Sequence, residues 1–227
     1  MKQLAVIFDL DGTLTDSGEG VINCVQLALS RLGVPCEDRE ALRVCVGPPL
    51  RESFPWFGVP ADQVEEAVAI YRSRYNTVGK YENEPYPGIR ALLDRLKAAG
   101  VSLYVGTSKP EAMALDILEH FGLAGCFDRI CGADFAGTRD SKVDVLRYLL
   151  KSLPADARPL MVGDTIYDVA GAAELQIPTI GVTWGFGSAR EMEEAGAIAI
   201  VDTMDALYDR ILALEPGKNP LAMGHTI

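Results

Sequence analysis

The amino-acid sequence predicts an α/β fold, in which a mostly parallel sheet carries helices on both faces. Short apolar runs alternate with helix-like stretches along most of the 227-residue chain, and such alternation is typical of parallel sheets. One segment after the first apolar run has helical periodicity and little strand character, which indicates a helical insertion. Together these observations predict a Rossmann-like sheet core with an inserted helical cap.

The expected strands are short apolar runs, and from the second run onward a helix-like stretch follows each one. The run "VSLYVGTS", for example, precedes "PEAMALDILEHFG", which has helical character. A helical crossover is the usual way to connect two parallel strands. The predicted strands are Leu4–Phe8, Val101–Ser108, Phe127–Ala133, Pro159–Asp164, Pro178–Thr183 and Ala197–Val201.

The expected insertion lies directly after the first strand. Its first stretch, "VINCVQLALSRLG", and a later one, "QVEEAVAIYRSRYNTVG", are amphipathic helices by their periodicity. Between them, "VGPPLRESF" predicts a turn and a short helix, and "ENEPYPG" reads as a return linker. We therefore expect a core at residues 1–15 and 86–227 and a cap at residues 16–85. The tail "PGKNPLAMGHTI" is expected to fray.

Composition narrows the class of protein. Hydrophobic residues make up 48% and charged residues 23%, an ordinary globular balance, and the formal net charge is −11. An acidic chain is a poor non-specific ligand for nucleic acid polymers. No apolar run reaches the roughly 18 residues of a membrane span, and the five dispersed cysteines form no C-x-x-C pair. We expect a cytoplasmic protein that binds neither membrane nor nucleic acid and is a monomer or a homodimer.

Charged and polar side chains follow the predicted strands at their carboxyl ends, where open α/β sheets bind ligands. Two aspartates follow the first strand in "VIFDLDGTLTDS", and hydroxyls, further carboxylates and a lysine follow later strands. The topology therefore brings them to one rim of the sheet. They are Asp9, Asp11, Thr107, Ser108, Lys142, Asp164 and Asp168.

Clustered carboxylates repel one another unless a cation lies among them. The cluster offers oxygen ligands and contains neither His nor Cys, a donor set that suits Mg²⁺. Because Mg²⁺ usually binds substrate phosphate as well, Thr107, the backbone N–H of Ser108 and Lys142 become candidate donors to phosphate oxygens. The pattern thus predicts a magnesium and phosphate site.

These residues resemble the haloacid dehalogenase superfamily. The resemblance is carried by D-x-D-G-T at Asp9–Thr13, a strand that ends in Thr107, Lys142, and G-D-x-x-x-D at Gly163–Asp168. These motifs occur in the family's order and cover nearly the whole chain. "DLDGTLTDS", the helical insertion, "VGPPLRESF" and "GTSKP" look like its phosphoglycolate phosphatase and 5′-nucleotidase-like branch.

The resemblance implies a role for each residue at the first motif. Asp9 would be the nucleophile that forms an aspartyl-phosphate, and Asp11 the acid and then the base. Thr13 would fix the turn that carries Asp11. The metal would be held by Asp9, by the backbone carbonyl of Asp11 and by Asp164, with Asp168 in support. An aspartate at the position of Asp11 favours phosphoryl transfer, because a halide leaving group needs no proton.

The expected activity is hydrolysis of a small phosphorylated metabolite, such as phosphoglycolate, a nucleoside monophosphate or a sugar phosphate. Arg51 in the insertion is the candidate for selecting among substrates, because its planar fork can hold a second anionic group. Two alternatives stay open: a phosphosugar mutase that uses the same aspartyl-phosphate, and a non-catalytic phosphate-binding module on the same fold.

Each residue also has an ordinary structural interpretation. Asp9 and Asp11 could form a turn after the strand, Asp164 could cap a helix, and Asp168 could be a surface charge. Thr107 and Ser108 could likewise be turn residues. Lysines at helix starts and arginines in loops are usually solvated, which applies to Lys142 and Arg51.

Overall fold

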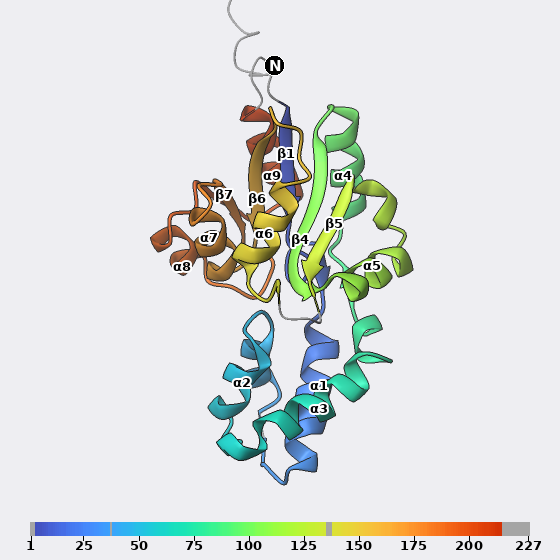
Figure 1. Ribbon diagram of the computed structural model, residues 1–227, viewed down its shortest axis with the longest axis vertical. Coiled ribbons are helices and arrows are strands. Elements are labelled where there is room, and N and C mark those ends of the chain that lie inside the picture. Colours follow the sequence, from blue (N-terminus) through green and yellow to red (C-terminus); the bar gives the residue numbers. More distant parts are fainter. Residues whose placement is uncertain (1–2, 37, 135–137, 215–227) are drawn as a thin grey trace, which may run out of the picture.

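The computed structural model of the chain describes residues 3–36, 38–134 and 138–214, and the expected frayed tail lies outside these ranges. In Figure 1 the sheet and the helices that flank it form the upper part of the view, and the helical insertion forms the lower part, at the carboxyl ends of the strands. Within the described residues, no helix has the length and apolar character needed to cross a membrane.

In the described part of the chain, the main sheet has six strands in the order β5-β4-β1-β6-β7-β8, and all of its pairings are parallel. The predicted Rossmann-like α/β class is therefore confirmed. Each predicted strand is present, with ends that differ by no more than two residues. The strands are β1 Leu4–Phe8, β4 Ser102–Pro110, β5 Arg129–Ala133, β6 Arg158–Gly163, β7 Thr179–Val182 and β8 Ala199–Val201.

Strand β1 lies in the centre of the sheet and is buried throughout. It pairs with β4 on one side and with β6 on the other, so that Phe8 lies opposite Val105 and Val162. A strand buried on both faces reads as a continuous apolar run, which explains why "LAVIF" has no polar position. The first aspartate, Asp9, follows where this apolar run ends.

Helices cover both faces of the sheet. Alternate residues of β1 enter two hydrophobic clusters, with Val6 and Phe8 packed on one face and Ala5 and Ile7 on the other. The first cluster contains residues of α4, α5 and α9, and the second contains residues of α6 and α7. The helices after the insertion are α4 Ile89–Ala98, α5 Glu111–His120, η4 Ala124–Cys126, α6 Lys142–Leu150, α7 Ile166–Ala173, α8 Ala189–Glu194 and α9 Met204–Ala213.

The helical segment, which runs from α1 to η3, has its own hydrophobic cluster. Buried residues of α1 and α3 meet there, among them Val25, Ala28 and Val68. Such a cluster, separate from the sheet's, is typical of a small domain. The segment contains α1 Gly18–Arg31, η1 Glu40–Cys45, α2 Leu50–Trp56, η2 Ala61–Gln63, α3 Val64–Tyr75 and η3 Gly79–Tyr81.

A two-stranded antiparallel ribbon joins the helical segment to the core. It pairs β2 (Thr15–Asp16) with β3 (Glu84–Pro85). The expected cap boundaries at residues 16–85 fall on this ribbon, and the division into domains stays a prediction. Because both crossings lie side by side, a small change in the ribbon would move the helical segment as a unit.

Close backbone packing next to the ribbon generates a prediction about stability. A Cβ atom added at Gly20 of α1 would lie 2.0 Å from the carbonyl oxygen of Gly79. We expect Gly20→Ala to lower the free energy of unfolding by about 1–3 kcal/mol, as overpacking does. Gly125→Ala is the control, since its added methyl would meet open space. Urea denaturation measures both, and equal effects of the two substitutions would contradict the packing argument.

Candidate active site

Three neighbouring strands bring the predicted site residues to one edge of the sheet. Asp9 follows β1, Thr107 lies near the end of β4, and Asp164 follows β6. The sheet order β4-β1-β6 places these three ends side by side. Parallel strands end at the same edge, so the sequence positions converge for a topological reason.

The carboxylates of Asp9, Asp164 and Asp168 form a compact cluster. One carboxylate oxygen from each lies within 4.8 Å of the others. Asp164 and Asp168 are fully buried, and the Asp9 side chain is 12% exposed. Buried carboxylates at this spacing strongly disfavour being ionised together unless positive charge compensates them.

Lys142 supplies part of that positive charge. Its ammonium lies 2.7 Å from Asp9 Oδ1 and 2.7 Å from Asp168 Oδ1, and it donates to the carbonyl oxygen of Gly106 at 3.0 Å. The lysine is the first residue of α6 and is buried. It is therefore not a solvated surface lysine, and three carboxylates with one ammonium still leave an excess of two negative charges.

Asp164 is held by donors from two loops. Thr13 Oγ1 donates to Asp164 Oδ1 at 3.0 Å, and the backbone N–H of Phe186 donates to Oδ2 at 2.9 Å. A Cβ atom on Gly12 or Gly185 would lie within 2.3 Å of Asp164 Oδ2, so both loops approach this carboxylate as only glycine permits. The supporting role expected for Thr13 fits this geometry.

The second of these loops, "WGFG" at residues 184–187, was not predicted from the sequence. Trp184 Nε1 donates to the carbonyl oxygen of Thr13 at 3.1 Å, which ties this loop to the first motif. The Phe186 ring packs against the cluster of the helical segment. The available signal was a pair of glycines around aromatic residues just after a strand, a pattern that indicates close backbone approach.

Asp168 stabilises the start of α7 and orients Lys142. The backbone N–H and the hydroxyl of Thr165 both donate to Asp168 Oδ2, each at 3.1 Å, which forms a capping box. Its other oxygen pairs with Lys142. Both oxygens are thus engaged by the protein, in keeping with the expected supporting position.

Asp11 lies in a second ion pair, which was not predicted from the sequence. Lys109 Nζ is 3.1 Å from Asp11 Oδ2 and donates to the hydroxyl oxygen of Tyr75 at 2.6 Å. Asp11 Oδ1 is buried and has no hydrogen-bond partner among the described residues. The sequence showed Lys109 in "GTSKP", but nothing in the spacing connected it to Tyr75 of the helical segment.

The remaining predicted residues differ in their surroundings. Thr107 is buried, and its Oγ1 accepts the backbone N–H of Lys109 at 3.2 Å, whereas Ser108 is exposed. Arg51 lies on the surface of the helical segment, where its guanidinium forms bonds of 2.5 and 3.0 Å with Glu65. The role expected for Arg51 in substrate selection stays a prediction.

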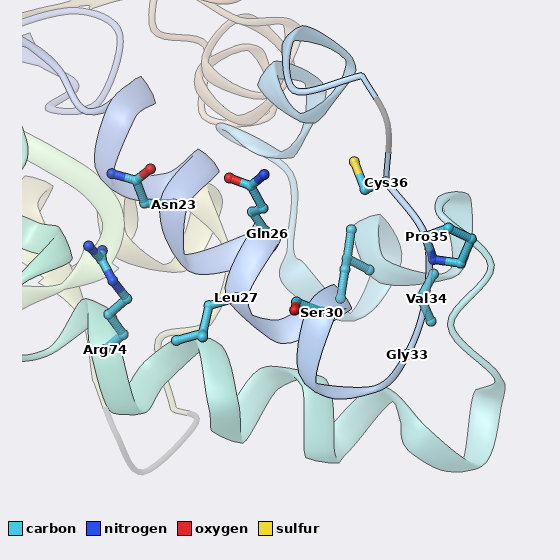
Figure 2. Close-up of a pocket in the computed structure, with 10 residues that line it drawn as sticks. Asn23, Gln26, Leu27, Ser30, Gly33, Val34, Pro35, Cys36 and Arg74 are labelled. Carbon is cyan, nitrogen blue, oxygen red and sulfur yellow. The ribbon is translucent and has the colours of Figure 1, made fainter.

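A separate hollow of ≈ 840 Å³ lies on the helical segment, beside α1 (Figure 2). Its lining includes Asn23, Gln26 and Ser30 of α1, together with Cys36 and Arg74. The guanidinium of Arg74 is held by both carboxylate oxygens of Glu82. None of the predicted site residues lines this hollow.

Burial, together with repulsion between the carboxylates, raises the pKa of two members of the cluster. Burial raises the pKa of Asp9 to about 6 although Lys142 opposes the change, and repulsion from Asp168 adds to it. Burial, followed by repulsion from Asp168 and Asp9, raises the pKa of Asp164 well above its usual range. A divalent cation among these oxygens would stabilise the ionised form of both carboxyl groups and so lower their pKa values. The donor set consists of oxygens alone and carries more carboxylates than ammonium groups, which fits Mg²⁺.

The fold and the site define the class of this protein: an α/β fold with clustered carboxylates and a buried ammonium at the carboxyl edge of its sheet. Residues 6–182 match the model of the haloacid dehalogenase-like hydrolases. The chain belongs to this family, which confirms the resemblance expected from the motifs.

Named relatives cover most of the chain. The 5′-nucleotidase of Pseudomonas aeruginosa is 42% identical over 189 residues, 82% of this chain and 86% of that protein. The phosphoglycolate phosphatase of Rhodospirillum rubrum is 32% identical over 228 residues, 96% of this chain and 94% of that protein. Both names agree with the branch that the sequence resembles.

A third relative has a different name and a solved structure. The tyrosine-protein kinase PtkA of Mycobacterium tuberculosis is 41% identical over 209 residues, 91% of this chain and 72% of that protein. Its structure matches with a TM-score of 0.82 over 92% of this chain and 98% of that chain, at 40% identity. The shared fold therefore occurs in relatives named for different phosphoryl-transfer reactions.

The raised pKa of Asp9 predicts a pH-dependent effect on stability. A carboxyl whose pKa rises from 3.8 to about 6 on folding is stabilising when protonated, and that contribution is lost as the pH rises through about 6. With metal chelated, Asp9→Asn should raise the free energy of unfolding at about pH 7 by roughly 3 kcal/mol. The difference should shrink towards about pH 4, where the wild-type carboxyl is protonated.

Urea denaturation in chelator at several pH values measures this effect. Asp144→Asn is the matched control, because a hydrogen bond from Ser141 lowers the pKa of Asp144. Its substitution should therefore be destabilising near neutral pH. Loss of stability in Asp9→Asn at about pH 7 would contradict the account of the cluster.

Proposed function

We propose that this phosphatase is an Mg²⁺-dependent phosphomonoester hydrolase that acts through an aspartyl-phosphate on Asp9. The observation that carries the proposal is the buried cluster of Asp9, Asp164 and Asp168, in which three carboxyl groups have only one ammonium beside them. A nucleophilic carboxylate beside such a site has the charge and ligands that phosphoryl transfer requires.

The residues that would hold Mg²⁺ are Asp9, the backbone carbonyl of Asp11 and Asp164. When bound, the ion supplies positive charge that offsets the carboxylates and the phosphoryl oxygens. Thr13 and the N–H of Phe186 keep the Asp164 carboxylate oriented through their hydrogen bonds. Asp168 would act indirectly, because its ion pair with Lys142 orients that lysine.

The chain's own residues account for the two chemical steps. A carboxylate oxygen of Asp9 attacks phosphorus, and the bond from phosphorus to the ester oxygen breaks. The departing oxygen takes a proton from Asp11, whose Oδ1 is free of hydrogen bonds among the described residues. Asp11 then accepts a proton from water as that water attacks phosphorus, which releases inorganic phosphate and regenerates Asp9. Lys142, Thr107 and the N–H of Ser108 are the proposed donors to phosphoryl oxygens.

The position of the helical segment supports the proposal that it acts as a cap. It lies over the carboxyl ends of the strands (Figure 1), and its Tyr75 reaches Lys109 beside Asp11. A cap over the site excludes water and contacts the leaving group. We propose residues 16–85 as this cap and keep Arg51 as the candidate for binding a second anionic group.

The proposed substrates are small phosphorylated metabolites: a nucleoside monophosphate or phosphoglycolate. The similarity to a 5′-nucleotidase and to a phosphoglycolate phosphatase supports both. A mutase would use the same aspartate but pass the phosphoryl group to an acceptor other than water, and a kinase would likewise require such an acceptor. We further propose a cytoplasmic protein that is a monomer or a homodimer and binds no nucleic acid polymer.

Phosphate release across a panel of monoesters tests the proposal. We expect turnover with Mg²⁺, loss of turnover in chelator and recovery when Mg²⁺ is restored. Ca²⁺ should inhibit, because its looser coordination misplaces the phosphate. One inorganic phosphate should appear for each ester consumed, whereas a mutase or kinase would yield less. Full activity after exhaustive chelation would contradict the metal assignment. If none of the esters in the panel were hydrolysed, the result would favour a non-catalytic phosphate-binding module.

A further inference from the structure

The two leading aspartates have separate lysine partners. Lys142 pairs with Asp9 inside the carboxylate cluster, and Lys109 pairs with Asp11 outside it. The proposed acid therefore has a cation of its own. The hydrogen bond from Lys109 to Tyr75 extends this pair into the helical segment.

Lys109 links two parts of the structure that only the ribbon connects covalently. It lies at the end of β4 in the core, whereas Tyr75 is the last residue of α3 in the helical segment. The Lys109 side chain is 8% exposed, and Tyr75 is buried as well. A buried ammonium needs polar partners, because its desolvation is costly. Asp11 and Tyr75 provide them from opposite sides of the junction.

Packing holds the Tyr75 ring in place. It stacks on Tyr71, one helical turn earlier, with ring centroids 5.1 Å apart and an interplanar angle of 17°. The ammonium of Lys109 lies 4.5 Å from the centroid of the Tyr75 ring, within the range of a cation–π contact. Tyr75 therefore contacts the lysine through both its hydroxyl and its ring.

The charge states agree with this geometry. Burial would lower the pKa of Lys109, but Asp11 and Tyr75 outweigh it, so that the pKa is raised and the amine stays charged. Burial raises the pKa of Tyr75, against the effect of Lys109, so its hydroxyl stays protonated. The phenol oxygen thus accepts from Lys109.

The consequence falls on Asp11. Its Oδ2 is engaged by Lys109, while Oδ1 has no hydrogen-bond partner among the described residues. The ion pair fixes the rotation of the carboxyl group and leaves one oxygen for proton transfer. If α3 moved away, Lys109 would lose one acceptor, and this restraint on Asp11 would weaken.

We propose that Lys109 and Tyr75 are positioning residues that orient Asp11 for proton transfer when the helical segment lies against the core. This inference rests on the proposed function of Asp11 as the acid. Placement of the helical segment would thereby be coupled to the chemical step, since the tyrosine that completes the arrangement belongs to that segment.

The test compares two substrates that differ in how much they need an acid. Phenyl phosphate releases a more basic oxygen than 4-nitrophenyl phosphate does, so protonation by Asp11 matters more for phenyl phosphate. The measured quantity is kcat/KM, which reports the steps up to release of the phenol. Asp11→Asn, measured first, should lose much more activity on phenyl phosphate than on 4-nitrophenyl phosphate.

Tyr75→Phe removes the acceptor of Lys109 and keeps the ring. We expect kcat/KM to fall about tenfold on phenyl phosphate and by less than about twofold on 4-nitrophenyl phosphate, the size of one lost charged hydrogen bond. Lys109→Met should show the same selectivity with a larger loss. Tyr71→Phe is the matched control: Tyr71 is a buried tyrosine of the same helix, and the substitution removes its hydroxyl but keeps the ring that stacks on Tyr75. Because Lys109 donates to the hydroxyl of Tyr75, this control should leave both rates unchanged.

Each outcome separates the two claims. If Asp11→Asn lacks the selective loss, the proposed acid role fails. If Asp11→Asn shows it but Tyr75→Phe slows both esters equally or neither, the acid role stands and the positioning role is overturned. A Tm of Tyr75→Phe equal to that of wild type, together with the selective loss of kcat/KM on phenyl phosphate, would support positioning. A general loss of fold would instead lower kcat/KM on both esters.

Discussion

The structure depends on one electrostatic constraint: three carboxylates are buried together at the carboxyl edge of a parallel sheet, and a single ammonium pairs with two of them. One carboxylate oxygen from each of Asp9, Asp164 and Asp168 lies within 4.8 Å of the others, and Lys142 compensates only part of their charge. The central strand places Asp9 there because its apolar residues fill both faces of the sheet. The proposed divalent cation would offset the repulsion among these carboxylates, and its positive charge would also bind a substrate phosphate.

The residues around the cluster stabilise and orient its buried carboxylates. Thr13 and the N–H of Phe186 each satisfy one oxygen of Asp164, and glycines allow both loops to approach it. Phe186 also packs into the helical segment, and Lys109 joins Asp11 to Tyr75. The helical segment therefore contacts the site at two points, one near a proposed metal ligand and one near the proposed acid. Both contacts give a physical route by which the segment can affect catalysis.

The sequence was sufficient for those features that depend on local pattern and strand order. The apolar run Leu4–Phe8 predicted the first strand, and the position of Asp9 and Asp164 at the carboxyl ends of predicted parallel strands, with Lys142 at a helix start, predicted that these residues would converge. It was insufficient for contacts between distant elements: Lys109 and Tyr75 are separated along the chain, and neither apolar periodicity nor a motif records that their side chains meet. The partner of a surface arginine is equally hard to predict from the sequence, because the long side chain can adopt many rotamers and can pair with any nearby carboxylate. Arg51, for example, pairs with Glu65.

The central claim is that Asp9 carries the phosphoryl group during turnover. The most direct test is rapid acid quenching of the enzyme during hydrolysis of a phosphorus-labelled ester, followed by mass spectrometry of its peptides. Asp11→Asn should be examined alongside wild type, since loss of the base slows release of the phosphoryl group. The account predicts a hydroxylamine-sensitive phosphoryl group on Asp9 that is absent from Asp9→Asn. A phosphoryl group on another residue, or undiminished turnover by Asp9→Asn, would contradict it.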